Sequence, residues 1–308
     1  MIRPLLSVLA AGLLLLQNDP GGGGTQVDAS QKGRTTSVRL TFSQIKLSGD
    51  VKGGRGDGYR IKSPCWYEPF LNAEDMFKLK SDPRGNASRI IADERGFLEY
   101  IQQFKDKVGQ PGLWWVPAYD AGDPQGPACW GGLELFVFVP PNTTPPSGIT
   151  VQRLAEIARA ALTVPEPTVK LNPEDKSFVN LPTWVWLEGV GRPRRSVTAT
   201  IPGVMSVTVV ATLKGITIDP GAGSDRAEVR QDGCGASGKP YVKGGQFTCG
   251  VRYLRASLDQ PRTSYRLTVT SEWPVEIAGQ AAQAQLAPVR VQTTRDVQVG
   301  EIQSNVKP

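Results

Sequence analysis

The chain has 308 residues, enough for two domains of ordinary size, and its 39% hydrophobic and 21% charged residues are typical of a folded protein. It contains no histidine, which excludes Ser-His-Asp and Cys-His catalysis and zinc sites of the H-E-x-x-H type. The net charge of +6 is compatible with loose attraction to anionic wall polymers, lipid headgroups or nucleic acid, and equally with plain solubility.

The first 24 residues predict a signal-like segment and a Gly-rich tether. One arginine precedes an apolar run that ends at Leu16, and the polar stretch QNDPGGGG follows. The run is too short to span a bilayer comfortably, which favours a secretory signal. No pair of small residues offers a clean cleavage site after Leu16, so an uncleaved anchor or a misplaced start remains an alternative. We expect contact with a membrane only through such an uncleaved segment.

Residues 25–190 predict an α+β module. The alternating segment SVRLTFSQIKL, which begins at Ser37, predicts a strand. Apolar residues at helix spacing predict one helix over 87–108 and a second after Thr150, whose side chain is expected to cap it. One or two further strands are expected over 167–189, where alternation returns.

Residues 191–308 predict an all-β domain. Helix signals almost vanish after Arg192, and the short alternating runs that follow are separated by Gly, Pro, Asp and Ser. This spacing is typical of an antiparallel β-sandwich of about seven or eight strands. The predicted fold class is therefore an α+β N-terminal domain followed by an all-β sandwich.

Four cysteines form an even set, which agrees with export to an oxidising compartment. We pair them in order, Cys65 with Cys129 and Cys234 with Cys249, because each pair lies within one predicted domain. The alternative is a zinc site of four thiolates, which needs close C-x-x-C spacings that the chain lacks. No metal site is predicted.

The stretch GCGASGKP, residues 233–240, matches most of a phosphate-binding loop. Such a loop needs a buried strand before its first glycine, a helix after its lysine, and a Ser or Thr that binds magnesium. Here Pro240 occupies the Ser/Thr position, and the following residues lack helical periodicity. We therefore predict a disulfide-bonded, Gly-rich loop and neither a nucleotide nor any other cofactor.

The C-terminal region resembles the PKD (polycystic kidney disease) repeat, an immunoglobulin-like β-sandwich. The resemblance rests on IDPGAG at 218–223, CGVRY at 249–253 and YRLTV at 265–269, which follow the family's order and spacing. It implies a PKD-like sandwich over 191–308. The family's Trp, its second Asp and its His are replaced here, so no metal or ligand role of the family's acidic turn carries over.

More broadly, the chain is similar to a group of exported actinobacterial proteins of unknown function. It shares with them LPTWVW at 181–186, CWYEP at 65–69 and TRDVQVGEIQ at 294–303. The similarity spans most of residues 60–305. It implies an exported protein that joins an N-terminal module to the sandwich.

Four aromatic residues in a predicted long loop, residues 109–132, are candidates for a binding surface. They are Trp114, Trp115, Tyr119 and Trp130. Such residues either pack on the first disulfide and the interdomain seam, which is the commoner fate of Trp, or form a platform for a sugar or a peptide.

Carboxylates offer the catalytic chemistry that remains without histidine. Those near the first disulfide are Glu68, Asp120, Asp123 and Glu134. A glycosidase needs two carboxylates at a fixed separation, but no motif singles out a pair. We therefore predict no enzyme and no catalytic residue, and keep a carboxylate-dependent hydrolase of cell-wall glycan as an alternative.

Two short motifs that contain arginine lie in predicted loops. The triplet Arg55-Gly56-Asp57 matches a motif that integrin ligands use, although so short a motif in a Gly-rich turn is usually a coincidence. The segment RPRR at 192–195 is the tightest basic cluster and lies at the predicted domain junction. A solvated linker is favoured there over a specific nucleic-acid site, whose basic residues would extend over a whole face.

The leading hypothesis is a secreted or envelope-associated, non-catalytic protein. Its PKD-like sandwich would present a partner or contact an envelope protein or a wall glycan. An alternative is an accessory component of an exported pilus or secretion assembly, in which the ligand would be another protein.

Overall fold

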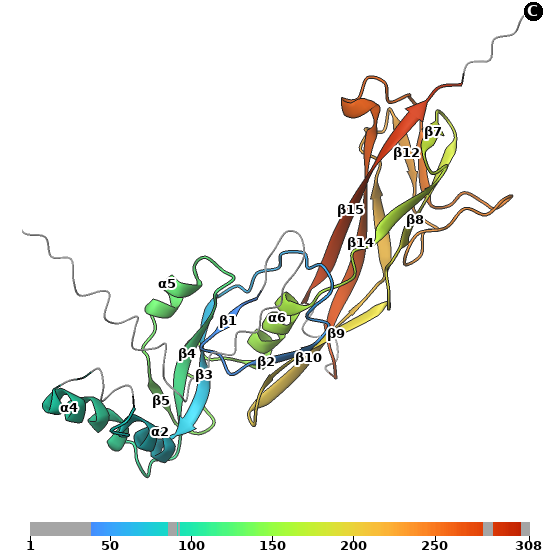
Figure 1. Ribbon diagram of the computed structural model, residues 1–308. Helices are drawn as coiled ribbons and strands as arrows, with labels where there is room; N and C mark the ends of the chain where they lie inside the picture. The colour runs from blue at the N-terminus through green and yellow to red at the C-terminus, as the bar shows by residue number, and fades with distance from the viewer. Residues whose placement is uncertain (1–37, 86–90, 92, 280–285, 303–308) are drawn as a thin grey trace, which may run out of the picture.

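The computed structural model describes residues 38–85, 91, 93–279 and 286–302 (Figure 1). The predicted signal-like segment and tether, residues 1–24, lie outside these ranges. The described chain is mostly β, and its strands form three sheets. All of its α-helices lie within residues 25–190, the region for which an α+β composition is predicted.

The first sheet carries the first disulfide. Its strand order is β1-β4-β3, with β5 also paired to β4; the strands are β1 (Leu40–Thr41), β3 (Cys65–Asn72), β4 (Leu113–Asp120) and β5 (Val137–Val139). Helices α2 (Ala73–Lys80) and α4 (Glu94–Lys105) pack together beside it, far from the C-terminal strands (Figure 1). The short helix α5 (Gly126–Gly131) follows β4.

Helix α4 confirms residues 94–105 of the helix predicted over 87–108, and residues 106–108 form turns. It begins after Asp93, whose side chain accepts hydrogen bonds from the N–H groups of Arg95 and Gly96. Residues 87–90 and 92 lie outside the described residues.

The prediction of a single strand from Ser37 is wrong. Leu40–Thr41 pairs with β4, whereas β2 (Lys46–Gly49) pairs with β9 of another sheet. Between the two strands the backbone turns at Phe42, which has a φ of 56°. The alternating pattern thus serves two sheets, because the chain changes direction within it.

The prediction of a long loop over 109–132 is also wrong, since β4 and α5 occupy most of it. The aromatic and β-branched residues of β4 favour a strand, and Pro117 argues against one because it lacks an N–H group. Pro117 is tolerated because it falls between the stretch of β4 that pairs with β5 and the stretch that pairs with β1.

The other two sheets contain the remaining strands. One has the order β2-β9-β10-β14-β15-β7, with β11 also on β14; its further strands are β7 (Lys176–Phe178), β9 (Arg194–Ile201), β10 (Met205–Thr212), β11 (Gly215–Asp219), β14 (Tyr265–Ile277) and β15 (Leu286–Gly300). The other has the order β12-β13-β8-β6; its strands are β6 (Thr168–Asn172), β8 (Pro182–Glu188), β12 (Ala227–Arg230) and β13 (Gly250–Tyr253). A 3-10 turn, η1 (Pro261–Thr263), precedes β14.

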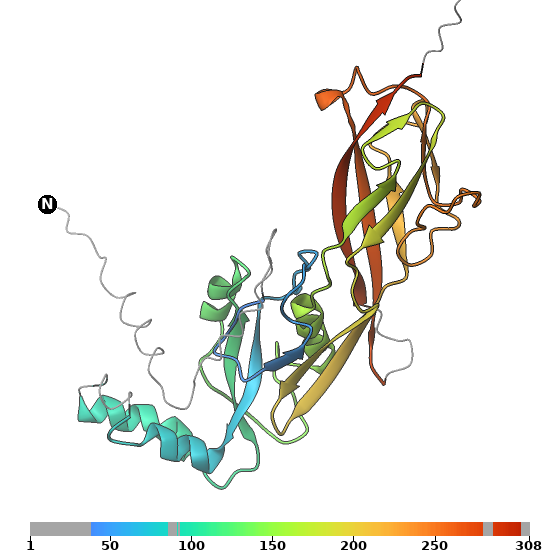
Figure 2. The ribbon, with the colours of Figure 1, turned by 45° about the vertical axis from the view of Figure 1, so that its right-hand side comes forward.

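Strands β14 and β15 pair along the C-terminal half of the molecule (Figure 2). Their buried residues belong to two clusters. Leu267 and Val297 belong to the C-terminal cluster, whereas Trp273 and Val289 belong to the cluster that holds helix α6 (Val151–Ala161). β6 and β8 pack in the first of these clusters, and β9 and β10 pack in the second. Val190, which is partly buried, packs against both clusters, and each cluster contains residues from both sides of position 190. The domain boundary predicted after residue 190 stays a prediction.

Both predicted cysteine pairs are present as disulfides. Cys65–Cys129 joins β3 to α5 across 64 residues, and Cys234–Cys249 closes the loop between β12 and β13. Because Cys249 is fully buried and Cys234 nearly so, the second disulfide belongs to the C-terminal cluster.

Gly250 in β13 allows this strand to lie close to β8, and its replacement tests that packing. A Cβ atom at Gly250 would lie 2.1 Å from the carbonyl oxygen of Thr183, and its φ is +142°. We expect Gly250→Ala to lower the free energy of unfolding by at least about 2 kcal/mol more than Gly244→Ala, whose φ is also positive but whose Cβ would meet nothing within 4 Å. Guanidinium denaturation measures both variants; equal losses would contradict the close packing.

Candidate functional site

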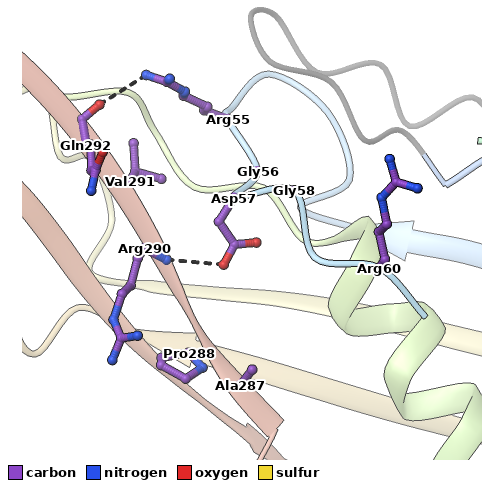
Figure 3. Close-up of a pocket in the computed structure, with 10 residues that line it drawn as sticks. All are labelled: Arg55, Gly56, Asp57, Gly58, Arg60, Ala287, Pro288, Arg290, Val291 and Gln292. Carbon is purple, nitrogen blue, oxygen red and sulfur yellow. Dashed lines mark hydrogen bonds between the residues drawn. The ribbon is translucent and has the colours of Figure 1, made fainter. Parts of the chain in front are cut away.

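A pocket of about 770 Å³ lies between the loop at residues 55–60 and residues 287–292 of β15 (Figure 3). These segments are far apart in the sequence, and they bring three arginines and one aspartate to the same opening. The loop contains the triplet Arg55-Gly56-Asp57. We take this pocket as the candidate site because it collects charged side chains from two separate parts of the fold.

The loop is anchored to the chain just after α6. Arg55 and Val164 exchange two main-chain hydrogen bonds, of 2.7 and 3.0 Å. Gly54 makes this approach possible, because a Cβ atom there would lie 2.5 Å from the carbonyl oxygen of Val164. The Gly-rich sequence thus fixes where the charged residues lie.

Arg159 of α6 is the buried centre of the site. Thr150 caps this helix by accepting a hydrogen bond from the N–H of Arg153, as predicted. The Arg159 side chain is 1% exposed, and both of its terminal nitrogens donate to the carboxylate of Asp57, at 3.2 and 2.6 Å. A buried guanidinium needs such a partner, since an unpaired charge in the interior is strongly unfavourable.

The same guanidinium also covers the edge of β15. It donates to the carbonyl oxygens of Ala287 at 2.6 Å and Pro288 at 2.8 Å. The main-chain N–H of Arg290 donates to Asp57 at 3.3 Å, and Arg55 donates to the carbonyl of Gln292 at 3.1 Å (Figure 3). Side chains therefore make hydrogen bonds to main-chain groups at the edge of β15, and these groups would otherwise be open to pairing with another strand.

Three arginines remain at the rim of the pocket, and each has an acidic partner outside it. Arg55 pairs with Glu166 at 2.7 Å and Arg290 with Glu272 at 2.8 Å. Arg60 lies 3.6 Å from Asp123. The side chains of Arg60 and Arg290 are 56% and 61% exposed, so solvent reaches both guanidinium groups.

A second pocket, of about 900 Å³, holds part of the basic segment 192–195. There Arg192 and Arg195 both pair with Asp50, at 3.2 and 2.9 Å, and Asp50 also accepts from the main-chain N–H of Ser196. Because these interactions converge on one carboxylate, they join the end of β2 to β9.

Trp114 and Trp115 are buried on opposite faces of β4, at 4% and 7% exposure. The ring centroid of Trp114 lies 4.9 Å from that of Phe104 and 5.3 Å from that of Phe138. All three rings belong to the small cluster between the first sheet and its helices. Trp115 belongs to the large cluster that holds α6. Both side chains are therefore core residues in this structure.

Tyr119 and Trp130 are half-buried and lie together beside the first disulfide. Phe42 joins them, with its ring 5.3 Å from that of Trp130 and 6.1 Å from that of Tyr119. The indole N–H of Trp130 donates to the carbonyl of Pro117. Of the four predicted binding residues, these two keep accessible aromatic surface. No pattern in the sequence indicates that Phe42 completes the group.

Glu68 is wholly buried and joins β3 to the turn between β1 and β2. Its carboxylate accepts hydrogen bonds from the Ser43 hydroxyl at 2.6 Å, the main-chain N–H of Gln44 at 2.6 Å and the Trp66 indole at 2.8 Å. Burial raises the pKa of Glu68, although these three donors act in the opposite direction. A glycan could not reach this carboxylate without opening the fold.

The other predicted carboxylates differ in their surroundings. Asp120 is buried, where it accepts from the main-chain N–H groups of Arg39 and Gly122. Asp123 accepts a hydrogen bond from the main-chain N–H of Gln125 and lies 3.6 Å from Arg60, while Glu134 is exposed. A glycan hydrolase would therefore depend on Asp123 and Glu134, so this alternative stays a hypothesis.

Residues 233–240 lie in the disulfide-closed loop between β12 and β13. In the described chain the next element after Lys239 is strand β13 and not a helix, and the Lys239 ammonium group lies 3.3 Å from the Thr248 hydroxyl. A phosphate-binding loop would require a helix N-terminus at this point.

Sequence reasoning missed Arg159 and Arg290. Arg159 interrupts a run of alanines in an apolar helix, and a lone arginine in such a run signals a buried ion pair once the helix is known to be covered. Arg290 carries no such signal, because an arginine in an exposed strand position is ordinary.

Comparisons with protein-family models, with curated proteins and with solved structures found no match for this chain. Among the described residues, no helix combines the length and the apolar character needed to cross a membrane.

Removing the Asp57 carboxylate tests the role of the buried ion pair. We expect Asp57→Ala to lower the free energy of unfolding by about 3–5 kcal/mol, because Arg159 would be left buried without a counter-charge. Glu166→Ala is the control: it removes the half-exposed partner of Arg55 and should cost less than about 1 kcal/mol. Chemical denaturation at neutral pH measures both, and a similar small loss in the two variants would contradict the buried role.

The raised pKa of Glu68 predicts a pH dependence of stability. Because the folded-state pKa lies above the unfolded value of about 4.3, the folded state holds the proton more tightly, and stability falls as pH rises through this window. Glu68→Gln cannot ionise and should lose this contribution, so its free energy of unfolding should fall less between pH 4 and pH 7. Chemical denaturation at several pH values measures this difference. If the free energy of unfolding changed equally with pH in Glu68→Gln and in the unchanged protein, Glu68 would have the same pKa in the folded and unfolded states.

Proposed function

We propose that this protein is an exported, non-catalytic protein of the cell envelope that presents or contacts an envelope partner. Its C-terminal part would serve as an immunoglobulin-like, PKD-like sandwich. The N-terminal part would carry the contact site. The support comes from the architecture and from the roles that its polar residues take in the fold.

The observation that carries the proposal is the continuous ribbon of β14 and β15. The two strands pair from Tyr265 with Val297 to Val275 with Leu286, and the ribbon borders both buried clusters. A ribbon of paired strands resists bending, since bending would strain a ladder of main-chain hydrogen bonds. Such a continuous element suits a protein that holds a contact site away from its point of attachment.

Export is supported by the two disulfides. Cysteine pairs persist in oxidising compartments and are rare in the cytosol. The described residues contain two disulfides and no free cysteine.

A C-terminal sandwich is supported by two sheets that share one buried cluster, and its PKD-like character rests on the sequence resemblance. The sheet of β6, β8, β12 and β13 and the sheet of β11, β14 and β15 share one buried cluster. At 218–223, where the resemblance places the acidic turn, Asp219 accepts a hydrogen bond from the N–H of Gly221. The side chain thus stabilises the turn itself.

Fractionation of the native host tests the proposal. We expect the protein outside the cytoplasm, trimmed beyond Leu16, with Cys65–Cys129 and Cys234–Cys249 peptides in a non-reduced digest. Mass spectrometry with alkylation before and after reduction measures all three. An intact, fully reduced chain in the cytosol would contradict export.

The non-catalytic part of the proposal needs its own measurement. Asp123→Asn and Glu134→Gln should each leave the turnover of cell-wall glycan at the level measured with the unsubstituted protein. Loss of turnover in either variant, with the fold intact, would favour the hydrolase.

A further inference from the structure

The candidate pocket has more positive charge than the fold requires. Its lining residues include three arginines and one aspartate. The aspartate is Asp57, whose charge is matched by the buried Arg159. The lining is therefore cationic, while the acidic partners of its arginines, Glu166, Glu272 and Asp123, lie outside it.

The rim arginines keep open hydrogen-bond donors. A guanidinium has five N–H groups. Within the described chain, Arg55 contacts its partners through one terminal nitrogen, and the Arg290 side chain donates to Glu272 through one. Arg60 is 3.6 Å from Asp123, beyond hydrogen-bond distance.

The three guanidinium groups do not converge on one point. Figure 3 shows Arg55 reaching toward Gln292, Arg60 directed away from β15, and Arg290 on the opposite side of Asp57 from Arg60. One small oxyanion would therefore meet one guanidinium at a time. A chain with repeated anionic groups could meet several.

The edge of β15 argues against an extended peptide as the occupant. Added strands bind through main-chain hydrogen bonds. Here the carbonyls of Ala287, Pro288 and Gln292 already accept from arginines. The N–H of Arg290 is taken by Asp57, and Pro288 has no N–H.

We propose that this pocket binds a linear polyanion of the cell envelope, through phosphate or carboxylate groups repeated along a non-peptide chain. Arginine suits both groups, because its planar fork matches either oxyanion. The proposal rests on the proposed function, which places the protein where such polymers occur. It names the partner class for the candidate site.

Isothermal titration calorimetry on the full, oxidised chain at low salt tests the pocket. The probes are a glycerol-phosphate oligomer, a galacturonate oligomer of equal charge and the monomer of each, with a glutamate oligomer of equal charge as the peptide for comparison. We expect at least one oligomer to bind at least about tenfold more tightly than its monomer, and the binding to weaken as salt rises. The tighter oligomer identifies phosphate or carboxylate as the natural group.

Paired variants locate the binding. The double variant Arg60→Gln, Arg290→Gln should weaken binding about tenfold or more. The matched control, Arg84→Gln with Arg262→Gln, removes the same charge from side chains that are 90% and 82% exposed and lie outside the pocket, and should stay within about threefold of the unchanged protein. Thermal melting checks that all proteins fold, and Arg60→Lys with Arg290→Lys should bind at an intermediate level.

Four results would overturn the inference. They are no binding at low salt, equal weakening in the control variant, monomers that bind as tightly as oligomers, and a glutamate oligomer of equal charge that binds more tightly than either polymer. The last result would assign the pocket to an acidic peptide. Absence of binding by an exported, oxidised protein would remove this inference alone, whereas a cytosolic, reduced protein would remove the proposed function whatever the pocket binds.

Discussion

The buried ion pair between Arg159 and Asp57 is the interaction on which the arrangement of three chain segments depends. Arg159 comes from α6, Asp57 from a Gly-rich loop, and both reach the edge of β15. A buried guanidinium must have its charge balanced and its N–H groups occupied. Asp57 balances the charge, and the carbonyls of Ala287 and Pro288 take N–H groups. Because one side chain meets both needs together, the helix, the loop and the strand hold one another in place.

The ribbon of β14 and β15 extends this constraint along the molecule. Near Arg159, its residues belong to the cluster that includes α6, β9 and β10; further along, they belong to the cluster between the two C-terminal sheets. Rotation of one cluster against the other would have to bend strands that stay paired from Tyr265 to Val275. Val190, which contacts both clusters, adds a side-chain contact at the point where sequence reasoning places a linker. The composition of the chain changes near residue 190, but the buried clusters do not divide there.

The features that could be predicted from the sequence are local or follow from elimination. The Thr150 cap needs only the next three residues, and with four cysteines the in-order pairing needed only the assumption that each pair stays within one region. Strand partners are a different problem. Leu40 pairs with Asp120 and Lys46 with Thr200, and nothing in a continuous alternating pattern marks where the chain leaves one sheet for another. The site was missed for the same reason: Asp57 is 102 residues from Arg159 and 233 from Arg290, so its role depends on contacts that no short motif encodes.

The structural and binding roles in the pocket fall on different residues. Arg159 is enclosed, the Asp57 carboxylate is 16% exposed, and both are hydrogen-bonded to several groups, which is the pattern of groups that the fold needs. Arg60 and Arg290 are more than half exposed, and their acidic partners lie outside the pocket lining. Surface ion pairs of this kind add little to stability, so the fold gives no reason for these two arginines to stand at the same opening. The lining is cationic because Asp57, its one carboxylate, is paired with Arg159. Arg60 and Arg290 keep N–H groups that their acidic partners do not use, and these can reach an anionic partner.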